Sequence, residues 1–87
     1  MATDETSRRR FRVDGRVQGV GFRAWACRTG LEHRLRGIVQ NRDDGSVEVE
    51  AEGPASALDG FAAALRQGPR YARVDTIEEL RPHNTPL

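Results

Sequence analysis

The sequence predicts an α+β fold in which a four-stranded antiparallel sheet carries two helices on one face. Four stretches have the composition or the polar–apolar alternation of strands, and two further stretches are compatible with helices. Their order along the 87 residues is βαββαβ, the ferredoxin-like α/β sandwich. The dipeptide Asp44-Gly45, a strong hairpin signal, joins the second and third strands.

The first strand is predicted over residues 8–14, where polar and apolar residues alternate and Phe11 and Val13 face the core. Residues 1–7 are polar and aperiodic, so we expect a flexible N-terminal tail. Three consecutive arginines, Arg8-Arg9-Arg10, begin the strand. We interpret them as a solvated strand entry; the alternative is a contact with RNA or an acidic partner.

The first helix is predicted from about Phe22 to His33, and it is the weakest element of the chain. Gly30 lies inside it, at a cost of about 1 kcal/mol relative to alanine. Its apolar residues do not form one clean stripe: Phe22, Trp25, Ala26, Cys27 and Leu31. An early end near Gly30 is therefore the alternative.

A hairpin is predicted next, with strands over residues 36–40 and 46–52 and a turn over residues 41–45. In its second strand, apolar side chains occupy one face and glutamates the other: Glu48, Glu50 and Glu52. We interpret the glutamates as an ordinary solvated row on the outer face of the sheet. The alternative is a catalytic or metal-binding cluster.

The second helix is predicted to begin at Gly53-Pro54 and to end at Gln67-Gly68-Pro69. Its apolar residues have the i, i+3, i+4, i+7 spacing of an amphipathic helix: Leu58, Phe61, Ala62 and Leu65. A last strand with poor alternation is predicted over residues 74–80, with Val74 and Thr76 on the same face. Residues 82–87 are expected to be a C-terminal tail, which leaves one folded domain over residues 8–81.

The composition excludes several classes of function. All 14 basic residues are arginine, which excludes Schiff-base chemistry and a P-loop lysine. The single cysteine, Cys27, allows neither an intrachain disulfide nor a cysteine metal cluster, and the net charge of +1 argues against a general nucleic-acid binder. No run approaches the ~20 apolar residues of a membrane span, and the N-terminus lacks the apolar core of a signal peptide. We therefore expect a cytoplasmic protein that does not enter a membrane.

The segment from Gly15 to Arg23 connects the first strand to the first helix. Its three glycines permit a tight turn and a close approach of the backbone to a ligand. A turn that runs into a helix N-terminus directs several N–H groups at one point, where the helix dipole favours an anion. Arg23, in the first helical turn, adds a positive charge and a planar fork suited to phosphate oxygens. The segment therefore predicts a cradle for a phosphoryl group.

This segment closely resembles the first signature of the acylphosphatase family. Residues 37–41, followed by residues 44–49 and 52–54, resemble the second signature, and the resemblance covers about Phe11 to Val74. It implies the α/β sandwich described above. It also implies hydrolysis of the carboxyl–phosphate anhydride of small acyl phosphates, such as carbamoyl or acetyl phosphate, without a metal or cofactor. We expect a monomer that binds neither nucleic acid nor a membrane.

The resemblance assigns roles to individual residues. The phosphoryl group is expected to contact Arg23 and the backbone of the loop formed by Gly15, Arg16, Val17, Gln18, Gly19, Val20 and Gly21. Asn41 is expected to orient the attacking water, and Ser46 to support the site. Arg34 stands where the family's helix normally ends with a left-handed glycine, so a strained or displaced helix exit is expected.

Two other classes of function stay open at this point. One is a non-catalytic regulatory module on the same fold, in which the cradle senses phosphate or another anion; it predicts binding without turnover. The other is an RNA-binding sheet, which needs exposed aromatic residues on the central strands. Phe11 is the only aromatic residue there, so the sequence favours this reading least.

Overall fold

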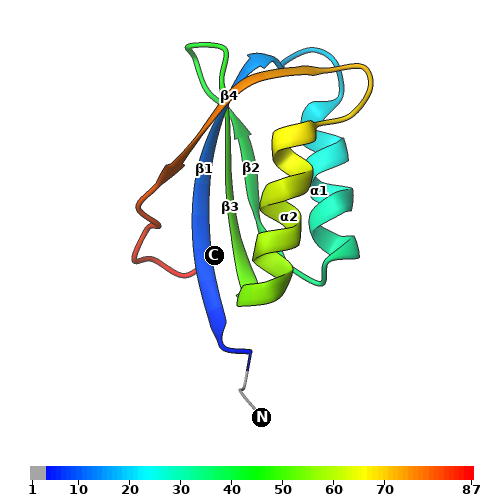
Figure 1. Ribbon diagram of the computed structural model, residues 1–87. Coiled ribbons are helices and arrows are strands. Elements are labelled where there is room, and N and C mark those ends of the chain that lie inside the picture. The colour runs from blue at the N-terminus through cyan, green and yellow to red at the C-terminus, as the bar shows by residue number, and fades with distance from the viewer. Residues whose placement is uncertain (1–3) are drawn as a thin grey trace.

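The computed structural model describes residues 4–87, and its elements follow the predicted order: β1 (Thr6–Arg16), α1 (Phe22–Glu32), β2 (Arg36–Asn41), β3 (Val47–Pro54), α2 (Ala55–Gln67) and β4 (Arg73–Leu80). Every strand pair is antiparallel, and the strand order is β2-β3-β1-β4. Both helices cover the same face of the sheet (Figure 1). The predicted fold is confirmed. No described helix is both long and apolar enough to cross a membrane.

The core lies between the sheet and the two helices. Phe11 and Val13 of β1 are fully buried, as their alternation predicts. They meet the apolar stripe of α2, whose four members are all buried: Leu58, Phe61, Ala62 and Leu65. Burial of each large side chain contributes about 1.5–3 kcal/mol, so the stripe accounts for the docking of α2 on the sheet.

β1 begins two residues before the expected boundary of the domain. Thr6 pairs with Pro54 at the end of β3. The carboxylate of Asp4 accepts hydrogen bonds from the hydroxyl of Ser56 and from its N–H at 3.1 Å, so it caps the first turn of α2. Within the expected tail, residues 4–7 are therefore tied to α2 and β3, and residues 1–3 lie outside the described part of the chain.

β4 departs from the expected alternation at one point. Thr76 lies opposite Asp14 of β1 and Val74 lies opposite Gly15, so β4 has one extra residue, Asp75, between them. Such a bulge reverses the faces of a strand, and Val74 and Ile77 both pack against the core as a result. The expectation that Val74 and Thr76 share a face is wrong, because periodicity does not locate a bulge.

α1 continues past Gly30 to Glu32, so the early end near Gly30 is ruled out. The helix ends in a Schellman motif, in which the N–H of Leu35 donates to the carbonyl of Gly30 and that of Arg34 to the carbonyl of Leu31, both at 2.9 Å. Arg34 takes the left-handed conformation that this motif requires, with φ of 60°. The unusual helix exit expected at this position is present, with an arginine in the place of a glycine.

Arg34→Gly is expected to raise the free energy of unfolding by about 0.5–1 kcal/mol. A side chain in the left-handed conformation costs about 1–2 kcal/mol, and the more flexible unfolded chain of the glycine variant cancels part of the gain. Equilibrium urea denaturation measures the difference. Arg34→Ala keeps the Cβ atom and removes the charge, so it should give no gain; an equal gain in both variants would assign the effect to the charge.

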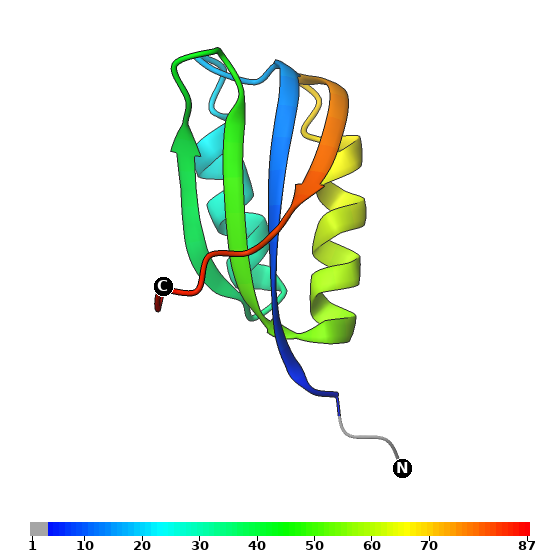
Figure 2. The same ribbon diagram turned by 90° about the vertical axis from the view of Figure 1, so that its left-hand side faces the viewer.

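The outer face of the sheet, opposite the helices, is lined by ion pairs. Arg8 contacts Glu52 at 3.0 Å and Arg10 contacts Glu48 at 3.5 Å. The segment after β4 crosses this face (Figure 2), and there Glu50 is only 3% exposed beneath His83. The expectation that Glu50 is solvated is wrong, since a segment distant in sequence covers the face on which the pattern placed it.

The partners of Glu50 keep it ionised. Burial by itself would raise the pKa of this carboxyl. Hydrogen bonds from the His83 ring at 2.5 Å and from the His83 backbone N–H at 2.8 Å, with the charges of His83 and Arg8, outweigh burial and lower the pKa of Glu50 below its ordinary value of 4.5. This carboxylate therefore joins the C-terminal segment to the sheet.

Glu50→Gln is expected to lower the free energy of unfolding by about 1–2 kcal/mol at neutral pH, because it removes charge-assisted hydrogen bonds. A lowered carboxyl pKa stabilises the fold above the unfolded-state pKa, and this contribution is lost as the pH falls through the folded-state pKa. The difference between wild type and variant should therefore shrink below about pH 4.5. Urea denaturation at about pH 7 and about pH 3 tests this; an undiminished difference at the lower pH would contradict it.

Candidate active site

The sheet register brings the termini of three strands together at one end of the sheet. Val47, the first residue of β3, lies opposite both Val13 of β1 and Asn41 of β2. The loop that follows β1 leaves the sheet at this end and leads into the N-terminus of α1. The β2–β3 turn lies at the same end (Figure 1). Residues from two separate connections are therefore collected at one end of the sandwich. We call residues 15–21 the glycine loop and residues 42–46 the hairpin turn.

The conformation of the glycine loop depends on glycine at its two ends. Gly15 has φ of 137°, and a Cβ atom there would lie 2.1 Å from the carbonyl oxygen of Arg73 on β4. Gly21 has φ of 83° and is the N-cap of α1. Between them, Val17 is buried and Val20 packs against the core. These contacts hold the loop on the sandwich while its backbone stays at the surface.

Five backbone N–H groups of the glycine loop have no acceptor among residues 4–87 of the protein. Within the described part of the chain, the N–H groups of residues 17–21 donate to no protein acceptor. The N-cap of α1 makes no side-chain hydrogen bond, and the first helical turn holds no acidic residue. Donors without a protein acceptor thus lead directly into the positive end of the helix dipole, an arrangement suited to an anion.

Arg23 lies in the first turn of α1 and its side chain is exposed. A positive charge is unfavourable at the N-terminus of a helix, because it faces the positive end of the dipole. An anion held by the adjacent N–H groups would reverse this cost. Two of the predicted cradle residues belong to the sheet: Gly15 and Arg16 are the last residues of β1 and lie opposite Val74 and Arg73 in the ladder.

Asn41 is the last residue of β2 and was expected to begin the turn. Val39, two residues earlier, packs against the core, so the alternation of the strand places Asn41 on the helix-covered face of the sheet. Its side chain is exposed at the edge where the glycine loop and α1 begin. An amide in this position can hydrogen-bond a water molecule beside a bound anion.

Ser46 supports the hairpin turn from inside. It is 1% exposed, and its hydroxyl and backbone N–H donate to Oδ1 of Asp44 at 2.6 and 2.9 Å. These two hydrogen bonds hold the pKa of Asp44 below its usual range, and the positive charges of Arg12 and Arg42 lower it further. Asp44 is therefore ionised at neutral pH, and its hydrogen bonds stabilise the turn.

The side chain of Gln18 connects the glycine loop to the hairpin turn. Its Nε2 donates to the backbone carbonyl of Arg42 at 2.7 Å and to that of Ser46 at 2.8 Å. Sequence reasoning used only the backbone of Gln18 and missed this contact. A glutamine in a loop carries no signal of its partner, because the partner is a main-chain carbonyl more than 20 residues away.

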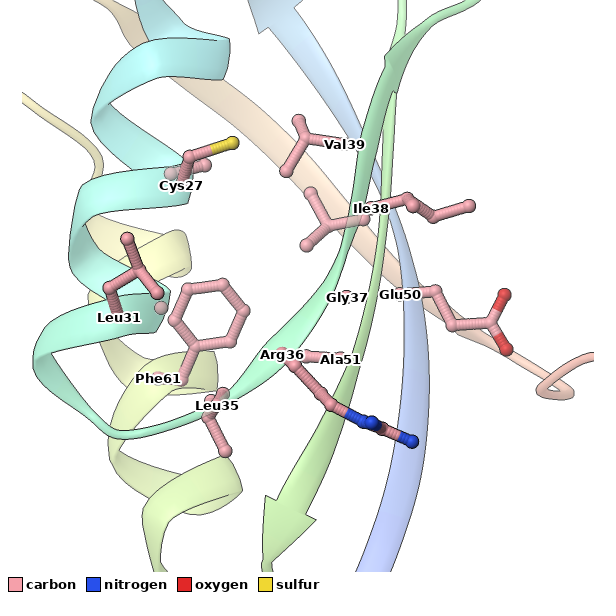
Figure 3. A pocket seen from close by; sticks show the side chains of 13 residues that line it. Cys27, Leu31, Leu35, Arg36, Gly37, Ile38, Val39, Glu50, Ala51 and Phe61 are labelled. Atoms are coloured by element: carbon pink, nitrogen blue, oxygen red, sulfur yellow. The ribbon is translucent and has the colours of Figure 1, made fainter. Parts of the chain in front are cut away.

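An apolar pocket of about 280 Å³ opens between α1 and the edge strand β2 (Figure 3). Cys27, Leu31 and Phe61 line it, while the side chain of Glu50 points away from it, to the outer face. The pocket shares no residue with the glycine loop or the hairpin turn. Leu31 is 71% exposed, so we interpret the pocket as an open groove at the margin of the core. Among residues 4–87, no group of three or more His, Cys, Asp or Glu side chains is placed to hold a metal.

Gly30→Ala is expected to raise the free energy of unfolding by about 0.5–1 kcal/mol, the usual gain for glycine replaced inside a helix. The added Cβ would lie 3.7 Å from the Phe61 ring, an ordinary contact at the edge of the apolar pocket. Gly60→Ala in α2 is the matched control, since its Cβ would lie 3.0 Å from the His33 ring and must displace it. Urea denaturation should show a larger gain for Gly30→Ala; a loss of stability would contradict the contact geometry.

This chain is similar in sequence to known acylphosphatases. The acylphosphatase family model matches residues 9–86. The acylphosphatase of Thermus thermophilus is 56% identical over 66 residues, which cover 76% of this chain and 75% of the relative. That of Salinibacter ruber is 46% identical over 78 residues, covering 90% and 82%.

Solved structures extend the likeness to the whole sandwich. The crystal structure of acylphosphatase from Bacillus subtilis has a TM-score of 0.78 and 41% identity, and the match covers 92% of this chain and 90% of that one. Full-length HypF, in its phosphate- and nucleotide-bound form, has a TM-score of 0.81 and 26% identity over 91% of this chain. The match covers only 10% of HypF.

Proposed function

Because this chain belongs to the acylphosphatase family and is therefore an enzyme that hydrolyses acyl phosphates, we propose that the glycine loop and Arg23 bind the phosphoryl group and that Asn41 positions the attacking water. One observation carries this assignment. The N–H groups of residues 17–21 have no acceptor within the described chain, and they run into an uncapped helix N-terminus beside Arg23. Such N–H donors and a guanidinium together can hydrogen-bond and neutralise a dianionic phosphoryl group.

The chemistry needs no general acid. Water attacks phosphorus, the bond between phosphorus and the acyl oxygen breaks, and its electron pair leaves on the carboxylate. A carboxylate has a pKa of about 4, so it leaves without being protonated. The products are the carboxylate and inorganic phosphate, and the protons of the water pass to phosphate and solvent.

The remaining work is electrostatic stabilisation and alignment. Phosphoryl transfer passes through a loose transition state in which negative charge spreads over the equatorial oxygens. Oriented N–H groups and a guanidinium stabilise that charge without reorganising. An amide is a poor base but a good hydrogen-bond acceptor. Asn41 is therefore suited to aligning the water for attack on phosphorus, and the loose transition state needs this alignment more than deprotonation of the water.

The substrate class rests on membership of the acylphosphatase family. We propose small acyl phosphates, such as carbamoyl or acetyl phosphate, and a monomer that works in the cytoplasm. Phe11 faces the core, and Arg8 and Arg10 on the outer face of the sheet are paired with glutamates. An RNA-binding sheet uses exposed aromatic side chains, on which bases stack, and unpaired basic residues. Both features therefore support a protein that does not bind RNA.

Hydrolysis of benzoyl phosphate in the presence of EDTA tests the proposal. We expect metal-independent turnover, and in water labelled with ¹⁸O we expect the label in phosphate, because the water attacks phosphorus. Label in benzoate would mean attack at the carbonyl carbon and would overturn the assigned roles. A folded protein that binds inorganic phosphate by calorimetry without turnover would instead support the sensor module.

A further inference from the structure

The two halves of the proposed site belong to different connections of the fold. The phosphoryl cradle lies between β1 and α1, while Asn41 lies at the end of β2. Among the strands of residues 4–87, β2 pairs only with β3, and β3 separates it from β1 in the sheet. The backbone ladder therefore sets the distance between cradle and amide only indirectly, through an intervening strand and a turn.

The side chain of Gln18 joins these halves directly. One amide nitrogen donates to two hairpin carbonyls, those of Arg42 at 2.7 Å and Ser46 at 2.8 Å. Both N–H bonds of the amide are used, one for each carbonyl. Arg42 is the residue that follows Asn41, so the contact is made one residue from the amide that is to hold the water.

The same carbonyls also close the turn. The carbonyl of Arg42 accepts the N–H of Gly45 at 3.1 Å, and that of Ser46 accepts the N–H of Arg42 at 2.8 Å. Gln18 therefore binds the turn in its closed conformation, in which both oxygens are brought together. A contact from β1 to the turn is the ion pair of Arg12 with Asp44 at 2.8 Å, whose side chains are 41% and 50% exposed. Exposed ion pairs of this kind contribute little to fixing the position of the turn relative to β1.

Resting on the proposed function, we propose that the side chain of Gln18 is a positioning residue that sets the distance and angle between the phosphoryl cradle and Asn41. The main-chain N–H of Gln18 belongs to the cradle, so its side chain and backbone serve the two halves separately. Replacing the side chain leaves that N–H in place. Misplacement of a reacting group by about 1 Å can cost about 10²-fold in rate.

A double-mutant cycle tests the proposal. Gln18→Ala, Asn41→Ala and the double variant are compared by kcat for benzoyl phosphate and by the inhibition constant of inorganic phosphate, with circular dichroism to confirm folding. We expect Gln18→Ala to lower kcat by about 10–10²-fold, with phosphate inhibition changed less than about threefold. The double variant should be no slower than Asn41→Ala alone, because Gln18 acts through Asn41.

Two further variants sharpen the cycle. Gln18→Glu keeps the length of the side chain but places carboxylate oxygens against two carbonyls, so it should lose at least as much kcat as Gln18→Ala. Gln67→Ala, which removes an exposed glutamine at the end of α2, should change nothing.

The outcomes separate the inference from the proposed function. If Asn41→Ala is impaired but Gln18→Ala keeps its full kcat, the positioning role is overturned and the proposed function stands. Losses that multiply in the double variant, or a loss of phosphate affinity that matches the loss of kcat, also overturn it, since Gln18 would then act independently of Asn41. Full activity of Asn41→Ala would overturn both.

Discussion

Arg23→Ala is expected to lower kcat/KM for an acyl phosphate by about 10³-fold or more, the range found when a single arginine is removed from a phosphoryl-transfer site. The guanidinium meets charge that is present in the bound phosphoryl group and grows in the transition state, so both KM and kcat should worsen. Inhibition by inorganic phosphate should weaken by at least about tenfold, because product and substrate share this contact. Steady-state kinetics of benzoyl phosphate hydrolysis measure all three quantities.

Matched variants separate the charge of Arg23 from its geometry. Arg23→Lys keeps a positive charge but lacks the planar fork, so it should recover only part of the activity. Arg28→Ala removes another exposed arginine of α1 and should leave the kinetics unchanged. The free energy of unfolding of Arg23→Ala should not fall, since a cation at the N-terminus of a helix does not stabilise it. An unchanged inhibition constant of inorganic phosphate in Arg23→Ala would mean that Arg23 does not bind the phosphoryl group.

Asn41→Ala is expected to lower kcat by about 10²–10³-fold, the usual loss when one oriented polar group is removed from a preorganised site. Its effect should differ from that of Arg23→Ala in one measurable respect. If Asn41 touches only the water, inhibition by inorganic phosphate should change by less than about threefold, while kcat falls. The pair of variants thus assigns one residue to the phosphoryl group and the other to the nucleophile.

The adjacent residue provides the control for Asn41. Gln40→Ala removes an exposed amide from the same strand, but Gln40 lies with Arg10 and Glu48 on the outer face of the sheet and should be neutral. Asn41→Asp keeps an acceptor oxygen but adds a negative charge beside the phosphoryl group, so it should not restore activity. Equal losses of phosphate affinity in Asn41→Ala and Arg23→Ala would mean that Asn41 binds the phosphoryl group itself.

Much of the candidate site could be predicted because its parts are contiguous in the chain. The glycine loop and the first turn of α1 form one uninterrupted segment, and glycine spacing before a helix is a local property. Asn41 and Ser46 flank a turn whose Asp44-Gly45 signal is equally local. The roles of Asn41 and Ser46 came from the resemblance to the family, and the register that places Val47 opposite both β1 and β2 brings the two segments to one end of the sheet.

By itself, the sequence determined the element order, the core faces of β1, β3 and α2, and the family, because periodicity and turn chemistry act over a few neighbouring residues. Three further features became visible only in the folded structure. Asp75 bulges β4 and turns Val74 inward, Glu50 is buried by the segment that carries His83, and Gln18 binds the hairpin turn. Each depends on which distant backbone or side chain arrives at the same place once the chain has folded, and no local pattern encodes that.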